Sequence, residues 1–141
     1  MDLLREHNEI IRDQLSQRGG YEVKSMGDGF MLAFRSARDG LNCAIAIQRA
    51  IATHNDSAAE PVQVRIGLHT GEAVQEQGDF FGKHVNLAAR IGGSATGAEI
   101  LVSSLLAQLV APSGEFALSE RPAMSLKGLD GEHVTHEVGW R

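Results

Sequence analysis

The run from Lys24 to Met31 could place a carboxylate and an amine near the same turn. Its Gly-Asp-Gly centre lies between two strand-like arms, residues 21–26 and 30–34. Asp-Gly between such arms is a strong signal for a tight β-hairpin, because glycine takes the positive φ that the turn demands. A carboxylate in a turn can reach Mg²⁺ without being buried, since this ion takes one or two carboxylates and keeps several waters. From these residues alone, Asp28 is either such a ligand or an ordinary turn residue.

Asn86 and Arg90 could together contact a phosphorylated sugar. They are four residues apart on a helix predicted over 85–91, which Gly92-Gly93 is expected to end. Residues at this spacing share one face of a helix. The amide can hold a ribose, and the planar guanidinium suits phosphate oxygens in a charge-rich transition state. The alternative is that both residues only form the solvated side of an amphipathic helix.

The elements that must position these side chains mix helices with strands. Helical spacing of apolar residues predicts helices over 2–18 and 37–54, the second with Ser36 as its N-cap. Ser103 or Ser104 is expected to cap a short helix through Leu109, and residues 72–84 are expected to be a polar loop. Besides the hairpin, strands are expected at 62–71, 99–102, 116–118, 124–126 and 134–138. One early hairpin and several late strands favour an α+β domain with a largely antiparallel sheet over a doubly wound parallel one.

Composition limits the class of protein. The 141 residues suffice for one domain with its own core, and 43% hydrophobic with 22% charged residues is ordinary for a globular protein. The net charge of −5 argues against a nucleic-acid partner. No stretch approaches the roughly 18 consecutive apolar residues of a membrane span, so no membrane contact is expected of this segment. Cys43 is the single cysteine, which excludes an internal disulfide and favours a cytoplasmic location.

Four motifs in order resemble the catalytic domain of class III nucleotidyl cyclases, the family of adenylate and guanylate cyclases. They are Lys24-x-x-Gly27-Asp28-Gly29-Phe30, Gly67-Leu68-His69-Thr70-Gly71, Gly82-x-x-Val85-Asn86-x-Ala88-x-Arg90 and Leu126-Lys127-Gly128. The similarity runs from about residue 7 to Val138. It implies one cyclase homology domain over 1–141 with a ferredoxin-like βαββαβ core. The family's first strand, which precedes the first helix, has no counterpart here.

The resemblance also implies roles for individual residues. Asp28 matches the second of two metal-binding aspartates, and the first belongs to the absent strand. A two-metal site with Mg²⁺ or Mn²⁺ is thus expected, with only one carboxylate ligand present. Lys24 and Asp79 match the positions that read adenine, and this combination favours ATP over GTP because guanylate cyclases usually carry Glu and Cys there. Lys127 matches a lysine that contacts the triphosphate.

The implied reaction converts ATP to 3′,5′-cyclic AMP and pyrophosphate for signalling inside the cell. The family's Asn86 counterpart orients the ribose, and its Arg90 counterpart stabilises charge at the α-phosphorus. Metal and base-reading residues come from different subunits in this family, which implies a homodimer with composite sites. Alternatives are a catalytically impaired nucleotide-binding or dimerising module, and a scaffold that only pairs with a partner chain. Strand exchange or dimerisation is expected where the absent strand leaves a sheet edge open.

The histidines give a weaker competing interpretation. His133 and His136 have a loose metal-ligand spacing, but residues three apart on a predicted strand face opposite sides. His69 and His84 lie inside the cyclase-like motifs. They are expected to be structural or to border the pocket, and neither is expected to be a general base.

Overall fold

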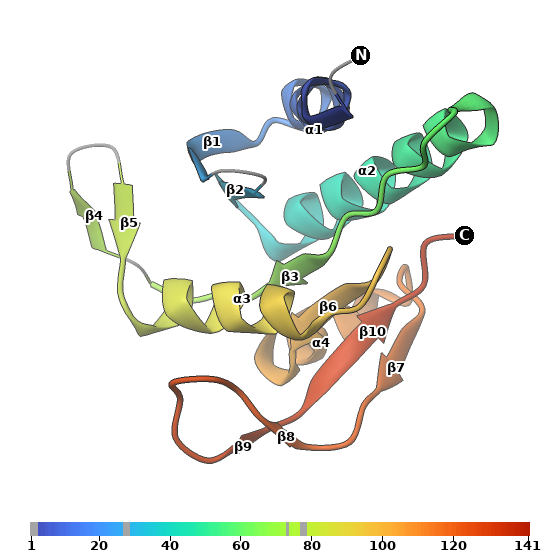
Figure 1. Cartoon of the computed structure of the whole chain (residues 1–141). Helices are drawn as coiled ribbons and strands as arrows, with labels where there is room; N and C mark the ends of the chain where they lie inside the picture. The colour runs from blue at the N-terminus through green and yellow to red at the C-terminus, as the bar shows by residue number, and fades with distance from the viewer. Residues whose placement is uncertain (1–2, 27–28, 73, 77–78) are drawn as a thin grey trace. The chain divides into compact units, whose positions relative to one another are not determined.

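The computed structural model describes residues 3–26, 29–72, 74–76 and 79–141, and Figure 1 labels their helices and strands. Their contacts divide the chain into two compact units. The first is Met1–Val64 with Trp140–Arg141, and the second is Arg65–Gly139. One domain over 1–141, as the sequence predicts, stays a prediction.

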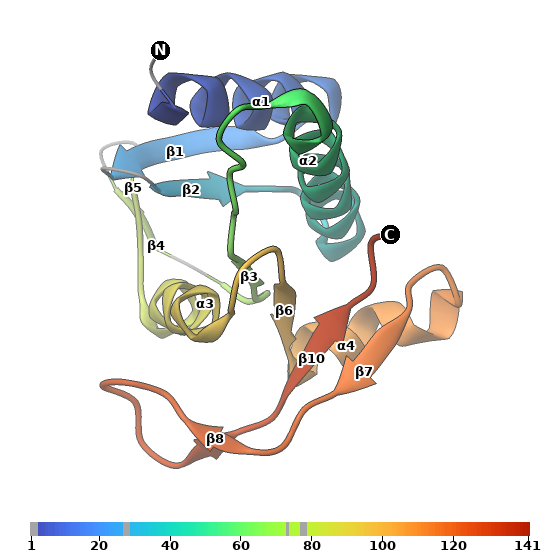
Figure 2. The same cartoon turned by 45° about the vertical axis from the view of Figure 1, so that its right-hand side comes forward.

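The first unit consists of two helices and one hairpin. In chain order its elements are α1 (Leu3–Gln17), β1 (Tyr21–Met26), β2 (Gly29–Ala33) and α2 (Ala37–Ser57). Helix α1 packs against α2 and also contacts β1, as Figure 2 shows. The buried apolar side chains of the two helices include Ile11, Leu15, Leu41, Ile47 and Ile51. Both helices and the hairpin lie where the sequence predicts them.

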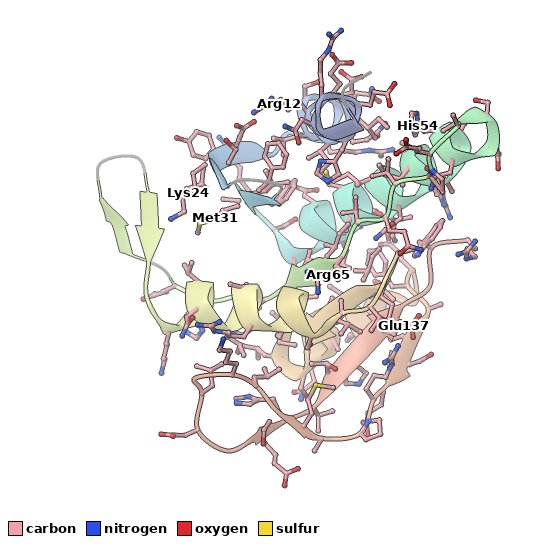
Figure 3. The ribbon with its side chains drawn as sticks, viewed as in Figure 1. Arg12, Lys24, Met31, His54, Arg65 and Glu137 are labelled. Atoms are coloured by element: carbon pink, nitrogen blue, oxygen red, sulfur yellow. The ribbon has the colours of Figure 1, made fainter. Side chains whose placement is uncertain are left out.

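The hairpin is tied to α1 by side chains. Strands β1 and β2 pair with each other in an antiparallel two-stranded sheet. Lys24 is opposite Met31 in the register, and Figure 3 shows the two side chains beside each other. Arg12 of α1 donates two hydrogen bonds to the Glu22 carboxylate, at 2.9 and 3.1 Å, and its guanidinium lies 5.0 Å from the centre of the Phe30 ring. One arginine thus contacts both strands.

Helix α2 begins at the predicted cap and contains the cysteine. The Ser36 hydroxyl accepts a hydrogen bond from the Asp39 backbone N–H at 3.0 Å, which satisfies one of the helix's unpaired amides. Cys43 is buried with 1% of its surface exposed. Burial raises the pKa of its thiol to about 11. Cys43 is therefore a small residue of the core.

The strand predicted over 62–71 is shorter in the structure. It begins at Ile66, as β3 (Ile66–Leu68). Side chains of α2 hold the preceding segment: Gln48 Nε2 donates to the Val64 carbonyl at 2.8 Å, and Asn55 exchanges two hydrogen bonds of 2.8 Å with the Val62 backbone. These side-chain bonds take the place of a strand ladder, which explains why alternating apolar residues there do not extend β3.

The second unit is built on a four-stranded sheet. After β3 its elements are β4 (Val74–Glu76), β5 (Asp79–Phe81), α3 (Lys83–Ser94), β6 (Ile100–Ser103), α4 (Ser104–Val110), the 3₁₀ turn η1 (Ala111–Ser113), β7 (Leu118–Glu120), β8 (Met124–Ser125), β9 (Glu132–His133) and β10 (Thr135–Val138). The sheet order is β3-β6-β10-β7, parallel between β3 and β6 and antiparallel elsewhere. Helix α3 packs on β3 and β6, and α4 contacts β6 and β10. The predicted α+β class with mainly antiparallel pairing is confirmed.

Two predictions for this unit are wrong in detail. Residues 72–84, expected to be a polar loop, contain the β4–β5 hairpin, in which Val74 pairs with Phe81. Helix α3 does not end at Gly92-Gly93 but runs through both glycines to Ser94. A glycine costs a helix only about 1 kcal/mol relative to alanine. Gly92 packs closely on Gly67 of β3, and this contact favours glycine over a larger residue at position 92.

Candidate functional site

Helix α3 presents Asn86 and Arg90 on its exposed side. Both residues are exposed, whereas Ile91 is buried with 1% of its surface accessible and Leu87 is partly buried. The two faces follow from the helical repeat, which places residues four apart on the same side. The amphipathic pattern therefore orients the amide and the guanidinium away from the core, and the shared face predicted for them is confirmed.

The inner face of α3 packs on a cluster that also fixes the β8–β9 loop. Its buried members are Ile91, Ala95, Leu101 and Leu126, and the partly buried residues packed on it are Leu87, Met124 and Leu129. Leu126 is 4% exposed, and the next residue, Lys127, is exposed. Burial of Leu126 beside α3 thus holds Lys127 at the surface next to the same helix.

A tight turn brings Lys127 and Arg90 into one neighbourhood. The Leu129 N–H donates to the Leu126 carbonyl at 3.0 Å, and Gly128 has a φ of +79°. A positive φ at the third residue of such a turn favours glycine. A Cβ placed on Gly128 would lie 3.9 Å from an Arg90 guanidinium nitrogen. Asn86, Arg90 and the Lys127 turn therefore form one surface with two cationic groups and an amide.

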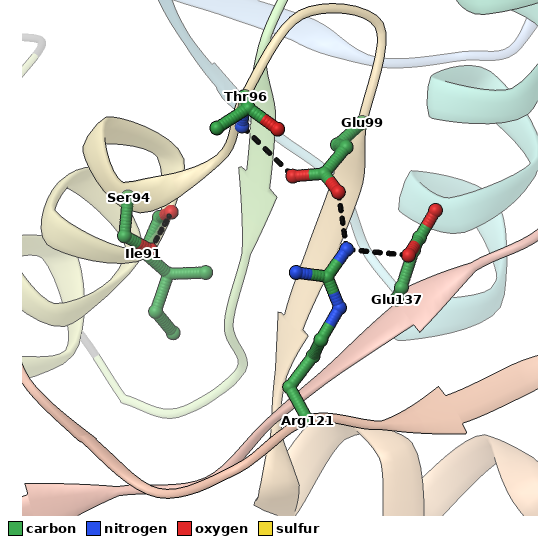
Figure 4. A network of polar contacts seen from close by, with 6 residues as sticks. All are labelled: Ile91, Ser94, Thr96, Glu99, Arg121 and Glu137. Atoms are coloured by element: carbon green, nitrogen blue, oxygen red, sulfur yellow. Dashed lines mark hydrogen bonds and ion pairs between the residues drawn. The ribbon is translucent and has the colours of Figure 1, made fainter.

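An ion-pair network braces the sheet behind α3. Figure 4 shows the Arg121 guanidinium between the carboxylates of Glu99 and Glu137, with Glu99 also accepting from the Thr96 N–H at 2.8 Å. Burial alone would raise the pKa of Glu99, but the Thr96 N–H and Arg121 outweigh it and the pKa lies below its ordinary value. The network therefore links Glu99, the residue before β6, to Glu137 of β10. The sequence alone does not predict this network, because Glu99, Arg121 and Glu137 are far apart in the chain.

The structure gives no position relative to this surface for the side chains of the other three predicted site residues. Lys24 is exposed on β1 and belongs to the first unit. Asp79 is the first residue of β5, which leads through Gly82 into α3, and its side chain is outside what the structure describes. Asp28 lies outside the described residues altogether. The roles of all six residues stay predictions.

No metal centre is formed by the part of the chain that the structure describes. Among the side chains that the structure describes, no three of His, Cys, Asp or Glu are grouped so that they could hold an ion. His133 Nε2 lies 3.1 Å from the Asp130 carbonyl oxygen, and His136 Nε2 lies 3.8 Å from a Glu120 carboxylate oxygen. The two histidines thus have separate partners.

Comparison with protein families decides the relationship. The model of the adenylate and guanylate cyclase catalytic domain matches residues 1–139. This chain belongs to that family. The resemblance read from the four motifs is confirmed, and the surface of Asn86, Arg90 and Lys127 lies within a cyclase catalytic domain.

Curated relatives agree with the family. An adenylate cyclase of Podospora anserina is 34% identical over a match that covers 72% of this cyclase domain and 6% of the relative. An uncharacterized protein of Mycobacterium tuberculosis is 33% identical over 97% of this domain and 34% of its own length. The domain thus spans about a third or less of these relatives.

Solved structures show the same fold. The adenylate/guanylate cyclase/hydrolase from Silicibacter pomeroyi superposes with a TM-score of 0.82 at 31% identity, covering 93% of this domain and 79% of that chain. The catalytic core of a rhodopsin-guanylyl cyclase with converted specificity, in complex with ATPαS, gives 0.85 at 25% identity, covering 98% and 80%. Across the described residues, no helix combines the length and apolar character needed to span a bilayer.

Proposed function

We propose that this cyclase domain converts ATP to 3′,5′-cyclic AMP and pyrophosphate. The observation that supports the proposal most is the surface on which Arg90 of α3 lies beside the Lys127 turn, with Asn86 one helical turn before Arg90. Two cationic side chains and an amide suit a triphosphate and a ribose. Family membership makes nucleotidyl cyclisation the reaction to test on this surface.

In the proposed reaction the ribose 3′-oxygen attacks the α-phosphorus in line. The bond from this phosphorus to the bridging oxygen breaks, pyrophosphate leaves, and the 3′-hydroxyl proton passes to solvent. Asn86 orients the ribose, Arg90 donates to oxygens of the α-phosphate as negative charge builds, and Lys127 binds the departing phosphates. Positioning and electrostatic stabilisation supply most of the rate enhancement in such a site.

Adenine selectivity is assigned to Lys24 and Asp79. A lysine ammonium can donate to a ring nitrogen, and a carboxylate can accept from the exocyclic amine of adenine. Guanine offers a carbonyl where adenine carries that amine, so the Asp79 carboxylate would then have one acceptor facing another. The double variant Lys24→Glu with Asp79→Cys should therefore raise the ratio of cyclic GMP to cyclic AMP formed. An unchanged ratio would contradict the assignment.

Divalent metal is expected to bind through Asp28, since cyclases of this family generally use Mg²⁺ or Mn²⁺. Bound metal would neutralise phosphate charge and favour the 3′-alkoxide. Only one of the family's two carboxylates has a counterpart in the sequence. For this reason a catalytically impaired nucleotide-binding or dimerisation module remains the alternative function.

The active form is proposed to be a homodimer with composite sites. If Asp28 acts from one copy and Arg90 from the other, Asp28→Ala and Arg90→Ala should each lower activity strongly when alone. Mixing the two variants should restore part of it, because mixed dimers contain one site with both residues intact. Failure of the mixture to recover any activity, with dimers shown by sedimentation, would contradict the composite arrangement.

The central experiment is a product assay on the unmodified chain with ATP or GTP and Mg²⁺ or Mn²⁺. We expect cyclic AMP, and Arg90→Ala should lower kcat by roughly 10²–10³-fold, the loss typical of removing one transition-state donor. Arg5→Ala is the matched control, because the Arg5 side chain is 76% exposed and pairs with Glu9 on α1. Nucleotide binding without any cyclic product, at a concentration that gives dimers, would support the impaired module instead.

A further inference from the structure

Two histidines and a serine form a chain of hydrogen bonds beside the proposed site. His69, the residue after β3, has its Nδ1 2.6 Å from the Ser103 hydroxyl and its Nε2 2.8 Å from Nδ1 of His84. The two imidazole rings are 5.0 Å apart between centres. Both ring nitrogens of His69 are therefore engaged, one with a hydroxyl and one with the second imidazole.

Each group in this chain comes from a different element. His84 is the second residue of α3, two residues before Asn86, and Ser103 is the last residue of β6. Ser103 also caps α4, because its hydroxyl accepts from the Leu106 N–H at 3.2 Å. The His69–His84 pair thus connects the first turn of α3 to the end of β3 and, through Ser103, to β6 and α4.

The backbone leaves room for the His84 ring at a glycine. Gly71 has a φ of +156°, and a Cβ there would lie 2.5 Å from Cγ of His84. Any side chain at this position would meet the ring in the place where it bonds to His69. The loop after β3 therefore accommodates His84 in this orientation.

The contact between the rings holds only while they share a single proton. A neutral imidazole has one N–H and one acceptor nitrogen, and an imidazolium has two N–H groups. One ring can donate to the other when both are neutral or when one is charged. When both are charged, two N–H groups face each other across 2.8 Å and the bond is lost.

The surroundings favour a neutral His69. Burial lowers the pKa of His69, and the neighbouring His84 lowers it further. On the elements packed around the pair, α3 carries Lys83 and Arg90, both exposed, and the loop after Gly71 carries Glu72, also exposed. Strand β6 and helix α4 contain no charged residue. Strand β5, which also contacts α3, contains Asp79.

We propose that the His69–His84 pair is a positioning device that fixes the first turn of α3, and with it Asn86 and Arg90, as long as at least one ring is neutral. This inference rests on the proposed nucleotidyl cyclase function for its effect on rate. Its structural part, a shared proton that restrains α3, stands independently of that function. Neither histidine is assigned a contact with substrate.

The kinetic test compares neutral and apolar replacements of His84 across pH. Unmodified protein should lose kcat on the acid side, with the KM for ATP changing less, as the second ring takes up a proton. His84→Phe should lower kcat roughly ten- to a hundredfold at every pH, since small misplacements of reacting groups cost about that much. His84→Gln should restore part of kcat and lack the acid-side loss, because its amide can hydrogen-bond but does not titrate.

The matched control is His133→Gln, which removes a histidine on β9 whose ring nitrogen Nε2 contacts the Asp130 carbonyl oxygen. It should keep both the kcat and the acid-side loss of the unmodified protein. Persistence of the acid-side loss in His84→Gln would overturn the proposal. So would an unchanged kcat in His84→Phe.

A readout without nucleotide separates this inference from the proposed function. Imidazole ¹⁵N NMR should show one hydrogen-bonded proton between the rings, and amide hydrogen exchange of residues 83–90 should accelerate below the pH at which it is lost. His84→Phe should show the faster exchange already at neutral pH. Two outcomes would contradict the proposal even if the enzyme is active. One is independent titration of the two rings, and the other is amide hydrogen exchange of residues 83–90 that changes neither with pH nor with the substitution. A chain with the shared proton and no cyclase activity would instead count against the proposed function alone.

Discussion

Gly67 of β3 and Gly92 of α3 meet backbone to backbone. A Cβ added to Gly67 would lie 2.2 Å from the Gly92 nitrogen and 2.9 Å from the Ala88 carbonyl oxygen. These are main-chain atoms, which cannot rotate away as the end of a long side chain can. The backbone of α3, the helix that carries Asn86 and Arg90, therefore packs directly on the backbone of β3, with no room for a side chain between them.

Gly67→Ala should destabilise the domain and reduce its activity. We expect a loss of about 1–3 kcal/mol in the free energy of unfolding, the usual cost of forcing an extra methyl group into a packed contact. Urea denaturation measures it, and the product assay should show a lower kcat because α3 must move. Gly93→Ala is the control, since nothing lies within 4 Å of a Cβ there and alanine favours the helix by up to about 1 kcal/mol. Equal effects of the two substitutions would contradict the packing argument.

Gly128→Ala should affect catalysis through the Lys127 turn. Gly128 has a φ of +79° and Gly131, in the same loop, has a φ of +75°. Alanine at either position should cost about 1–2 kcal/mol of stability, the usual penalty for a left-handed conformation. Only a Cβ on Gly128 would reach Arg90, at 3.9 Å, whereas one on Gly131 would meet nothing within 4 Å. We therefore expect similar losses on thermal denaturation and a raised KM for ATP only in Gly128→Ala.

The sequence was sufficient to predict the elements that local patterns define. Ser36, with apolar residues at helical spacing behind it, predicts the start of α2, and Asp-Gly between strand-like arms predicts the β1–β2 hairpin. Asn86 and Arg90 could be placed on one face because helical spacing alone decides that. These features depend on residues within a few positions of each other, where propensity and periodicity act directly.

Features that depend on distant residues could not be predicted in the same way. Gly128, next to Lys127, lies beside Arg90 because Leu126 is buried against α3, a contact between segments over thirty positions apart in the sequence. The β4–β5 hairpin was missed because polar residues in 72–84 resemble a loop and its strands are only three residues long. The bond from His69 to His84 joins two motifs whose connection no local pattern encodes.

Arg121 should make the second unit sensitive to acid. The pKa of Glu99 in the folded protein lies below its ordinary value. The ionised carboxylate therefore stabilises the folded state at pH values above its unfolded pKa of about 4.3. This stabilisation is lost as the pH falls through the lower pKa of the folded state. Arg121→Gln should therefore lower the midpoint of urea unfolding at pH 7 more than at pH 3. A difference between the variant and the unmodified protein that is the same at both pH values would contradict this role. Glu115→Gln, at an exposed position outside this network, serves as a control.

The Cys43 thiol should be unreactive towards thiol reagents in the folded protein. Its thiol is 1% exposed and has a pKa of about 11, so at pH 8 little thiolate exists to react. A thiol reagent such as dithionitrobenzoate should therefore label the folded chain very slowly and label one thiol per chain once urea unfolds it. Rapid labelling of the native protein would show that α2 opens locally.

Asn86 and Arg90 occupy one continuous helix, so their separation is fixed by its geometry. Four residues at about 1.5 Å each hold their Cα atoms roughly 6 Å apart along the axis. Bending a loop could alter such a distance, but a hydrogen-bonded helix whose inner face is packed cannot stretch or shorten. A molecule that contacts both side chains therefore meets two groups whose backbone positions are fixed relative to each other. Under the proposed function, the spacing of these two residues would therefore constrain which part of a nucleotide can contact both of them.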